Sequence, residues 1–214
     1  MKTIYLFSGL GADYRAFQNL ELDGFHKQFI VWEVPLANES LTAYAQRLLN
    51  QITSDKPILI GLSFGGIVAT EVANLIPAEQ VILISSVATR SELPFYFRHA
   101  GIVGLHRLIP FLQLVKFQRL NNWLFGVKSE SDKKVLSAII ADTQPDFLLW
   151  AIDIIVRWKN NTRLSNIVQL HGTADKLFPM YCNNAGIRIP GGGHFMVLNK
   201  AFEINVHLRS ILNP

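Results

Sequence analysis

The sequence predicts an α/β fold, a three-layer sandwich with a mostly parallel central sheet of about six strands and a helical cap insertion. Three observations carry this prediction. Short apolar, β-branched runs alternate with segments of helical period, which is typical of parallel strands joined by crossover helices. One of these strands runs into a G-x-S-x-G turn and then a helix. The stretch 91–162 lacks strand-like alternation, so residues 1–90 and 163–214 are predicted to form the core and 91–162 the cap of one structural domain.

The first elements follow from hydrophobic period and from the residues that end each run. Thr3–Phe7 is a short apolar run that breaks at Ser8-Gly9, so we expect a first strand there and not a signal peptide. Ala12–Leu22 is expected to be helical, with Phe17 and Leu20 facing inward. Phe29–Val34 is expected to be a strand that Pro35 ends.

The remaining core elements are predicted in the same way. Ser40–Ile52 places its apolar residues at the 3.6-residue period of a helix. We expect further strands over Pro57–Leu62, Gln80–Ser85, Ile167–Leu170 and Gly186–Ile189, and further helices over Phe64–Ile76 and Lys200–Leu212. Pro77 ends the first of these two helices.

The insertion, from Ser91 to about Asn161, is predicted to be helical. Leu105–Phe125 is amphipathic, and Pro110 is expected to bend or begin one of its helices. Ser129, three residues before Asp132, is typical of a helix N-terminus, and Pro145 suits a first helical position. Most apolar residues here are expected to be helix core and a minority to line an acyl pocket. Contact of Leu105–Phe125 with a membrane surface is a further alternative.

Ser63 is the candidate nucleophile. It lies in the G-x-S-x-G turn between an apolar strand and an Ala/Val-rich helix, and a turn this tight requires glycine at positions 61 and 65. The turn lifts the Ser63 hydroxyl out of the sheet. It also directs the Phe64 N–H and the positive end of the helix at whatever Ser63 attacks. A small turn serine is the rival interpretation, and the strand–turn–helix context favours the nucleophile.

Asp175 and His194 are the candidate acid and base. Each lies in a loop just after a predicted strand, and such loops converge at one edge of a parallel sheet. A helix-cap aspartate and a surface histidine are the rival interpretations. The other histidines (His26, His99, His106 and His207) are expected to be surface or cap residues, His171 to be structural, and Asp13 to be a turn or helix-start residue.

With these motifs in view, the chain resembles the α/β-hydrolase superfamily, in particular compact members with a helical cap such as small carboxylesterases. The resemblance rests on Ser8-Gly9-Leu10-Gly11, Gly61-x-Ser63-x-Gly65, His171-Gly172-x-x-Asp175 and Gly193-His194. It implies a catalytic triad of Ser63, His194 and Asp175. It also implies an oxyanion hole formed by the backbone N–H groups of Leu10 and Phe64. The family often has His-Gly where this chain has Ser8-Gly9.

The amino-acid composition indicates which classes of binding partner and which cellular location to expect. The chain of 214 residues has 20 basic and 16 acidic residues, and because the basic ones are scattered, nucleic-acid binding is a poor interpretation. Half of the residues are hydrophobic, yet no apolar stretch is long enough to span a membrane. The lone Cys182 forms no intrachain disulfide and suits a reducing compartment, so we expect a cytoplasmic protein. No metal or cofactor is expected.

Together these features predict a serine hydrolase that cleaves a carboxylic ester or thioester with an apolar acyl group through an acyl-enzyme. The alternatives are a lyase, acyltransferase or cofactor-free peroxidase on the same scaffold, or a binding or receptor protein. Five aromatic residues of the insertion are candidates for the substrate pocket: Phe95, Phe111, Trp123, Phe147 and Trp150.

Overall fold

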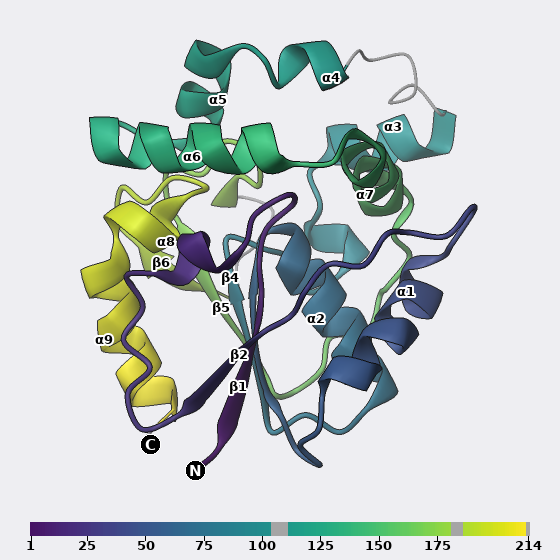
Figure 1. Ribbon diagram of the computed structural model, residues 1–214, viewed down its shortest axis with the longest axis vertical. Coiled ribbons are helices and arrows are strands. Elements are labelled where there is room, and N and C mark those ends of the chain that lie inside the picture. The colour runs from purple at the N-terminus through teal and green to yellow at the C-terminus, as the bar shows by residue number, and fades with distance from the viewer. Residues whose placement is uncertain (104–110, 181–185, 213–214) are drawn as a thin grey trace.

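The fold is a three-layer α/β sandwich, as predicted (Figure 1). The computed structural model describes residues 1–103, 111–180 and 186–212. Its sheet has six strands in the order β2-β1-β3-β4-β5-β6, and every neighbouring pair is parallel. The strands are β1 (Thr3–Phe7), β2 (His26–Phe29), β3 (Ile58–Leu62), β4 (Gln80–Ile84), β5 (Ile167–Gly172) and β6 (Ile187–Ile189).

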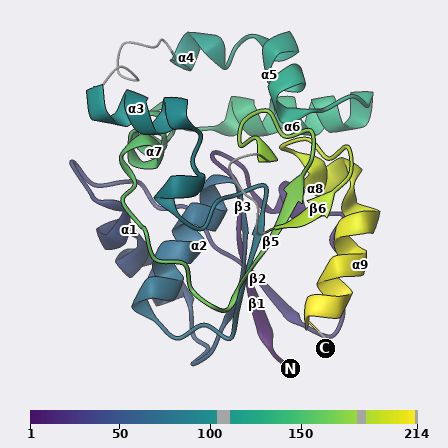
Figure 2. The same cartoon turned by 180° about the vertical axis from the view of Figure 1, so that it is seen from behind.

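Helices cover both faces of the sheet, because alternate residues of the central strands point to opposite faces. Tyr5 and Leu59 pack against α1 (Leu41–Leu48) and α2 (Phe64–Leu75). Ile4 and Ile60 pack on the other face, towards α8 (Met196–Asn199) and α9 (Ala201–Leu212). Figures 1 and 2 show the two layers on either side of the strands. Short 3-10 helices complete the core: η1 (Tyr14–Phe17), η2 (Leu49–Gln51) and η3 (Arg90–Glu92).

The helix predicted over Ala12–Leu22 is much shorter in the structure. Only Tyr14–Phe17 is helical, as the single turn η1, and the Asp13 side chain caps it by accepting from the Arg15 N–H. Beyond it, the Glu21 N–H donates to the Asn205 side chain of α9, so tertiary contacts replace further helical turns. Phe17 and Leu20 are buried, as the pattern predicted.

The second strand lies earlier than predicted, at His26–Phe29 in place of Phe29–Val34. It is an edge strand that pairs only with β1, and that pairing ends near the Ile30 N–H, which donates to the Leu6 carbonyl. After the pairing ends, side chains take the place of a strand partner and form hydrogen bonds with the backbone. The Gln51 amide bonds both the N–H and the carbonyl of Val31.

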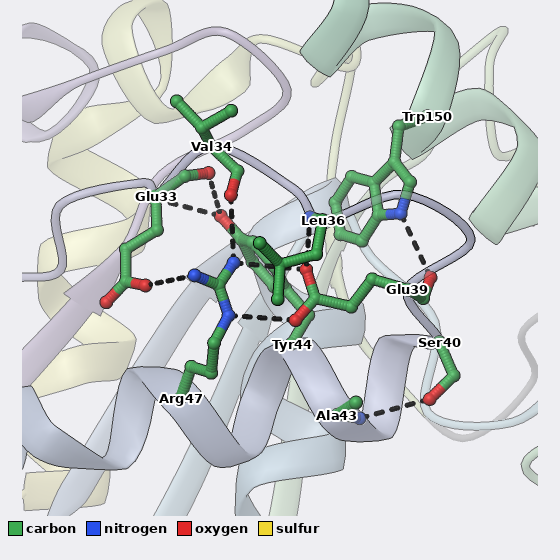
Figure 3. A network of polar contacts seen from close by, with 9 residues as sticks. All are labelled: Glu33, Val34, Leu36, Glu39, Ser40, Ala43, Tyr44, Arg47 and Trp150. Atoms are coloured by element: carbon green, nitrogen blue, oxygen red, sulfur yellow. Dashed lines mark hydrogen bonds and ion pairs between the residues drawn. The ribbon is translucent and has the colours of Figure 1, made fainter.

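A polar network fixes the segment that follows β2 (Figure 3). The Tyr44 hydroxyl accepts from the Glu33 N–H and donates to the Glu33 carbonyl, and burial raises the pKa of this phenol. The Arg47 guanidinium bonds the carboxylates of Glu33 and Glu39. Trp150 donates its indole N–H to the Glu39 carbonyl at 3.1 Å. This loop is thereby attached both to α1 and to the inserted helices.

In the described part of the insertion, five helices cover the carboxyl ends of the strands (Figures 1 and 2). They are α3 (Phe95–Val103), α4 (Phe111–Leu114), α5 (Gln118–Phe125), α6 (Glu130–Asp142) and α7 (Pro145–Arg157). As predicted, the Ser129 side chain accepts from the Asp132 N–H, and Pro145 begins a helix. Pro110 and the start of the predicted segment 105–125 lie outside the described residues.

Helix α7 is part of the main core, since Ala151 and Ile155 share a buried cluster with Phe64 and Tyr5. It therefore connects the insertion firmly to the sheet. None of the helices in the described ranges is long and apolar enough to cross a membrane.

Candidate active site

Ser63 occupies a strained turn between β3 and α2. Its backbone has φ 52° and ψ −121°, a conformation that costs free energy for any residue other than glycine. The turn is held by the Ser63 N–H, which donates to the Ile84 carbonyl at 3.0 Å, and by the Ser86 hydroxyl, which donates to the Ser63 carbonyl at 2.6 Å. A strained backbone persists where several surrounding contacts hold it in place, as these hydrogen bonds do here. In this conformation the Ser63 side chain lies at the end of the sheet.

The glycines on either side of Ser63 allow this turn to pack. A Cβ atom on Gly65 would lie 2.1 Å from the Ser8 carbonyl oxygen, and one on Gly61 would lie 2.4 Å from the Gly66 Cα. Both obstacles are backbone atoms that cannot rotate away. The requirement for glycine at these positions is thus steric, as the motif predicted.

Gly65→Ala is expected to destabilise the fold by about 3 kcal/mol, because an added methyl group must displace the strand β1 backbone. Urea unfolding followed by circular dichroism measures the change. Gly9→Ala is the matched control, since its Cβ would make only ordinary contacts at 3.7 Å. Equal stability of the two variants would contradict the steric account.

Hydrogen bonds join Ser63, His194 and Asp175 in a chain. His194 Nε2 lies 2.7 Å from Ser63 Oγ, and His194 Nδ1 lies 2.8 Å from Asp175 Oδ2. An ionised carboxylate only accepts hydrogen bonds, so Nδ1 carries the proton and Nε2 accepts from the Ser63 hydroxyl. His194 and Asp175 are 2% and 5% exposed, which keeps water from competing for these bonds.

The loop after β5 fixes the Asp175 carboxylate. The Leu177 and Phe178 N–H groups both donate to Asp175 Oδ1 at 2.9 Å, which leaves Oδ2 for His194. His171 Nε2 donates to the Phe178 carbonyl at 2.6 Å, so this buried histidine holds the loop, in keeping with the structural role expected of it.

Two phenylalanines enclose the His194 ring, and neither was predicted from the sequence. Phe125 and Phe178 each pack edge-on against it, with centroid distances of 5.5 Å and 5.3 Å. Phe125 comes from α5 of the insertion, and Phe178 from the Asp175 loop. Nothing in the local pattern distinguishes these rings from other core aromatics.

The two predicted oxyanion donors belong to segments that adjoin Ser63. Phe64 is the first residue of α2, and the first N–H groups of a helix have no intrahelical acceptor. Leu10 lies in the loop after β1, next to Gly9, whose Cβ position would be 3.7 Å from Ser63 Cβ. Both backbone N–H groups thus belong to segments that meet at the Ser63 side chain.

Ser8 anchors the Leu10 loop. Its hydroxyl donates to the Ala12 carbonyl and accepts the Trp32 indole N–H at 2.9 Å, and the side chain is buried. This pair of bonds supports the loop from its first residue. At Gly11, with φ 68°, a Cβ atom would overlap the Thr143 side chain, so the loop also touches the insertion.

An apolar pocket of about 740 Å³ adjoins this site. Its lining includes Leu10, in the loop after β1 that carries the predicted oxyanion donor (the oxyanion loop), and Phe125, which contacts His194. The other described residues of its wall come from the insertion, on α4, α5, α6 and the start of α7 and in the turns between them: Leu112, Val115, Lys116, Gln118, Asn121, Asn122, Ser137, Ile140, Ala141, Thr143, Pro145 and Leu148.

None of the five aromatic residues predicted for a substrate pocket lines this one. Phe147 and Trp150 belong to a buried aromatic cluster with Phe64, which joins α7 to α2. Phe95 and Trp123 are each 59% exposed. Phe111 begins α4 and is half-buried away from the pocket wall.

Other candidate residues lie apart from Ser63. Asp146 is exposed in the first turn of α7, and Asp153 forms an ion pair with Arg157. His106 and Cys182 fall outside the described residues. The described part of the chain has no group of acidic, histidine or cysteine side chains that could hold a metal ion.

Comparison with known proteins agrees with this architecture. A model described as the alpha/beta hydrolase family matches residues 9–204. No curated protein matches in sequence. An esterase from Exiguobacterium antarcticum has a TM-score of 0.75 at 13% identity, over 100% of this chain and 92% of that one.

Two further structures have similar scores. A thermophilic esterase from Thermogutta terrifontis has a TM-score of 0.72 at 17% identity, over 99% of this chain and 89% of that one. A bromoperoxidase from Bacillus anthracis has 0.68 at 18% identity, over 100% and 92%. Sequence identities this low support only a shared fold. The match to the family model covers residues 9–204, and it shows that the chain belongs to the α/β hydrolase family.

Proposed function

We propose that this protein is a serine hydrolase that cleaves a carboxylic ester or thioester with a largely apolar acyl group. The observation that carries the proposal is the chain of short hydrogen bonds from Ser63 Oγ through His194 to Asp175. A serine hydroxyl is a weak nucleophile until a neighbouring base takes its proton. The esterases among the similar structures have the same fold and are consistent with this chemistry.

The proposed reaction has two halves. The Ser63 oxygen attacks the acyl carbon while His194 Nε2 takes the hydroxyl proton, and Asp175 stabilises the resulting imidazolium. The Leu10 and Phe64 N–H groups receive the oxyanion. Collapse breaks the bond to the alcohol or thiol, which leaves with the proton from His194. Water, deprotonated by His194, then attacks the acyl-enzyme. The bond between the acyl carbon and Ser63 Oγ breaks, the Ser63 oxygen takes the proton back from His194, and the carboxylic acid leaves.

The apolar acyl preference is proposed from the pocket. Its wall adjoins the oxyanion loop at Leu10 and continues over Leu112, Ile140 and Leu148. A concave, mostly apolar cavity of several hundred Å³ is typical of small-molecule sites. An acyl chain that extends from the scissile carbonyl into this cavity would bury its methylene groups there.

A fluorophosphonate probe and a graded ester series test the proposal. Ser63 should be labelled covalently, with the adduct mapped by peptide mass spectrometry, and p-nitrophenyl esters or acyl-CoA thioesters should be hydrolysed. Labelling without turnover of any ester or thioester would favour a lyase, acyltransferase or peroxidase. Absence of both labelling and turnover would favour a binding protein. Labelling that persists in Ser63→Ala would refute the assignment of the nucleophile.

Acyl-chain preference should depend on Ile140, which lines the pocket on the same face of α6 as Ser137 and Ala141. Ile140→Trp is expected to lower kcat/KM for long acyl chains by tens of fold while p-nitrophenyl acetate changes little, since each lost methylene contact is worth about 1–3 kcal/mol. Ile140→Ala should shift the optimum to longer chains.

The matched control for this series is Trp123→Ala, because Trp123 belongs to the same insertion but does not line the pocket. Its chain-length profile should equal that of the wild type. A profile that responds to Trp123→Ala and ignores both Ile140 variants would place the acyl site elsewhere.

A further inference from the structure

The outer face of the insertion combines exposed aromatic side chains with positive charge. Phe117, Leu120 and Trp123 are 60%, 38% and 59% exposed. They recur every three residues at and along α5, so they share one side of the helix. Single exposed apolar residues are ordinary, whereas a cluster of large ones on a single helix face indicates a contact surface.

The charge of this region is of one sign. Between Glu92 and Glu130 every charged residue of the sequence is Lys or Arg. Lys116 and Arg119 flank Phe117, Lys128 follows α5, and all three are exposed. The acidic residue that ends the stretch, Glu130, is paired with Lys133 at 2.6 Å.

Trp123 shows how the two properties combine. The Lys176 ammonium lies 4.0 Å from the centre of the Trp123 ring and donates to the Trp123 carbonyl at 2.8 Å. An exposed indole beside an ammonium group suits the boundary between lipid headgroups and acyl chains, where an amphipathic side chain keeps its polar end in water.

The position of this face in the molecule fits such a contact. Helices α4 and α5 form the end of the molecule opposite the N-terminus (Figures 1 and 2). The apolar pocket lies beneath the same segment, since Lys116 and Gln118 belong to its wall. A flat surface could therefore meet α5 without obstruction from the sheet or from α9.

We propose that the α5 face, defined by Phe117, Arg119, Leu120, Trp123 and Lys128, docks on an anionic lipid surface. Cations near such a surface and aromatic rings at its boundary contribute additively to peripheral binding. Docking would bring the part of the pocket wall formed by Lys116 and Gln118 close to the bilayer. Delivery of substrate from the bilayer to this pocket rests on the proposed hydrolase function, whereas the docking itself does not.

Vesicle binding tests the proposal without any measurement of turnover. The full chain is titrated with vesicles of phosphatidylcholine alone or mixed with phosphatidylglycerol, and binding is read by sedimentation and by Trp emission. Of the four tryptophans, only Trp123 is strongly exposed, so a blue shift of the emission on binding reports its burial. Trp123→Phe should keep the binding and lose the shift.

The expected results separate this face from the rest of the protein. Anionic vesicles should bind and phosphatidylcholine vesicles should bind far more weakly, with affinity falling as salt rises. Phe117→Ser combined with Trp123→Ser should weaken binding by at least about tenfold. Arg119→Glu should weaken it by about tenfold. The matched controls, Phe202→Ser on α9 (74% exposed) and Lys27→Glu on β2, should bind like the wild type.

Several outcomes would overturn the proposal. One is no binding to anionic vesicles at low salt, and another is equal losses in the α5 variants and in their controls. Sensitivity of self-association to the Phe117 and Trp123 changes, without vesicle binding, would identify a second copy as the occupant. Selective binding of a single-stranded oligonucleotide, without vesicle binding, would identify nucleic acid.

Discussion

Ser63→Ala and His194→Ala are each expected to lower kcat by about 10⁴–10⁶-fold, and the double variant by little more. The reason is the 2.7 Å contact between Ser63 Oγ and His194 Nε2, because a nucleophile and its base act as one unit. Either loss leaves only the binding pocket and the backbone donors of Leu10 and Phe64. Steady-state hydrolysis of p-nitrophenyl esters, with burst kinetics for the acyl-enzyme, measures the effect.

The control for these variants is His26→Ala, since His26 is exposed on β2. It should hydrolyse esters at the wild-type rate. Ser63→Ala should unfold near the wild-type temperature, because it removes only a hydroxyl. His194→Ala is expected to unfold at a lower temperature, because it leaves the buried Asp175 carboxylate without its imidazole partner, so its activity is measured well below that temperature. Losses that multiply in the double variant would show that the two residues act independently and would contradict the proposed mechanism.

Asp175→Asn is expected to lower kcat by about 10⁴-fold with the fold intact. The two N–H groups of Leu177 and Phe178 hold Oδ1 of the carboxylate. An amide in its place would keep its oxygen there and turn its NH₂ group towards His194 Nδ1. The imidazole would then carry its proton on Nε2, which could no longer accept the Ser63 proton.

Asp153→Asn is the matched control, because Asp153 lies on α7 in an ion pair with Arg157 and away from His194. Its turnover should be near normal, and thermal unfolding should show both variants folded. A large loss in Asp153→Asn, together with near-normal turnover in Asp175→Asn, would transfer the orienting role to Asp153.

Local sequence determined the sheet and the position of Ser63. The apolar strand of Ile58–Leu62, the glycine-flanked turn and the apolar helix after it are short-range patterns, and each is decided by sterics and hydrophobic period within a few residues. The parallel pairing of the core strands follows from the alternation of strands and helices, because parallel strands require crossovers. The positions of Asp175 and His194, in loops after β5 and before α8, were predictable for the same reason.

Where long-range contacts competed with local preference, the prediction failed. The local pattern around Val31 predicts a strand, yet β1 provides no further pairing partner beyond Ile30. The side chains of Gln51 and Tyr44 form hydrogen bonds with the backbone there instead. The segment after Asp13 reads as a helix, yet Asn205 of α9 engages the Glu21 N–H. Hydrophobic periodicity and secondary-structure propensity are local properties, so they carry no information about contact partners that lie tens or hundreds of residues away in the sequence.

The sequence by itself thus determined the fold class and the candidate catalytic residues. Which side chains surround those residues was decided only by the tertiary structure. Only the folded chain brings Phe125 and Phe178 against His194, replaces the predicted aromatic pocket by a wall that includes Ile140 and Leu148, and turns Trp123 outward. The physical reason is that a helix has one apolar pattern but several possible neighbours. Which side chains face a cavity, a core or the solvent depends on how the helices of the insertion pack on one another and on the sheet.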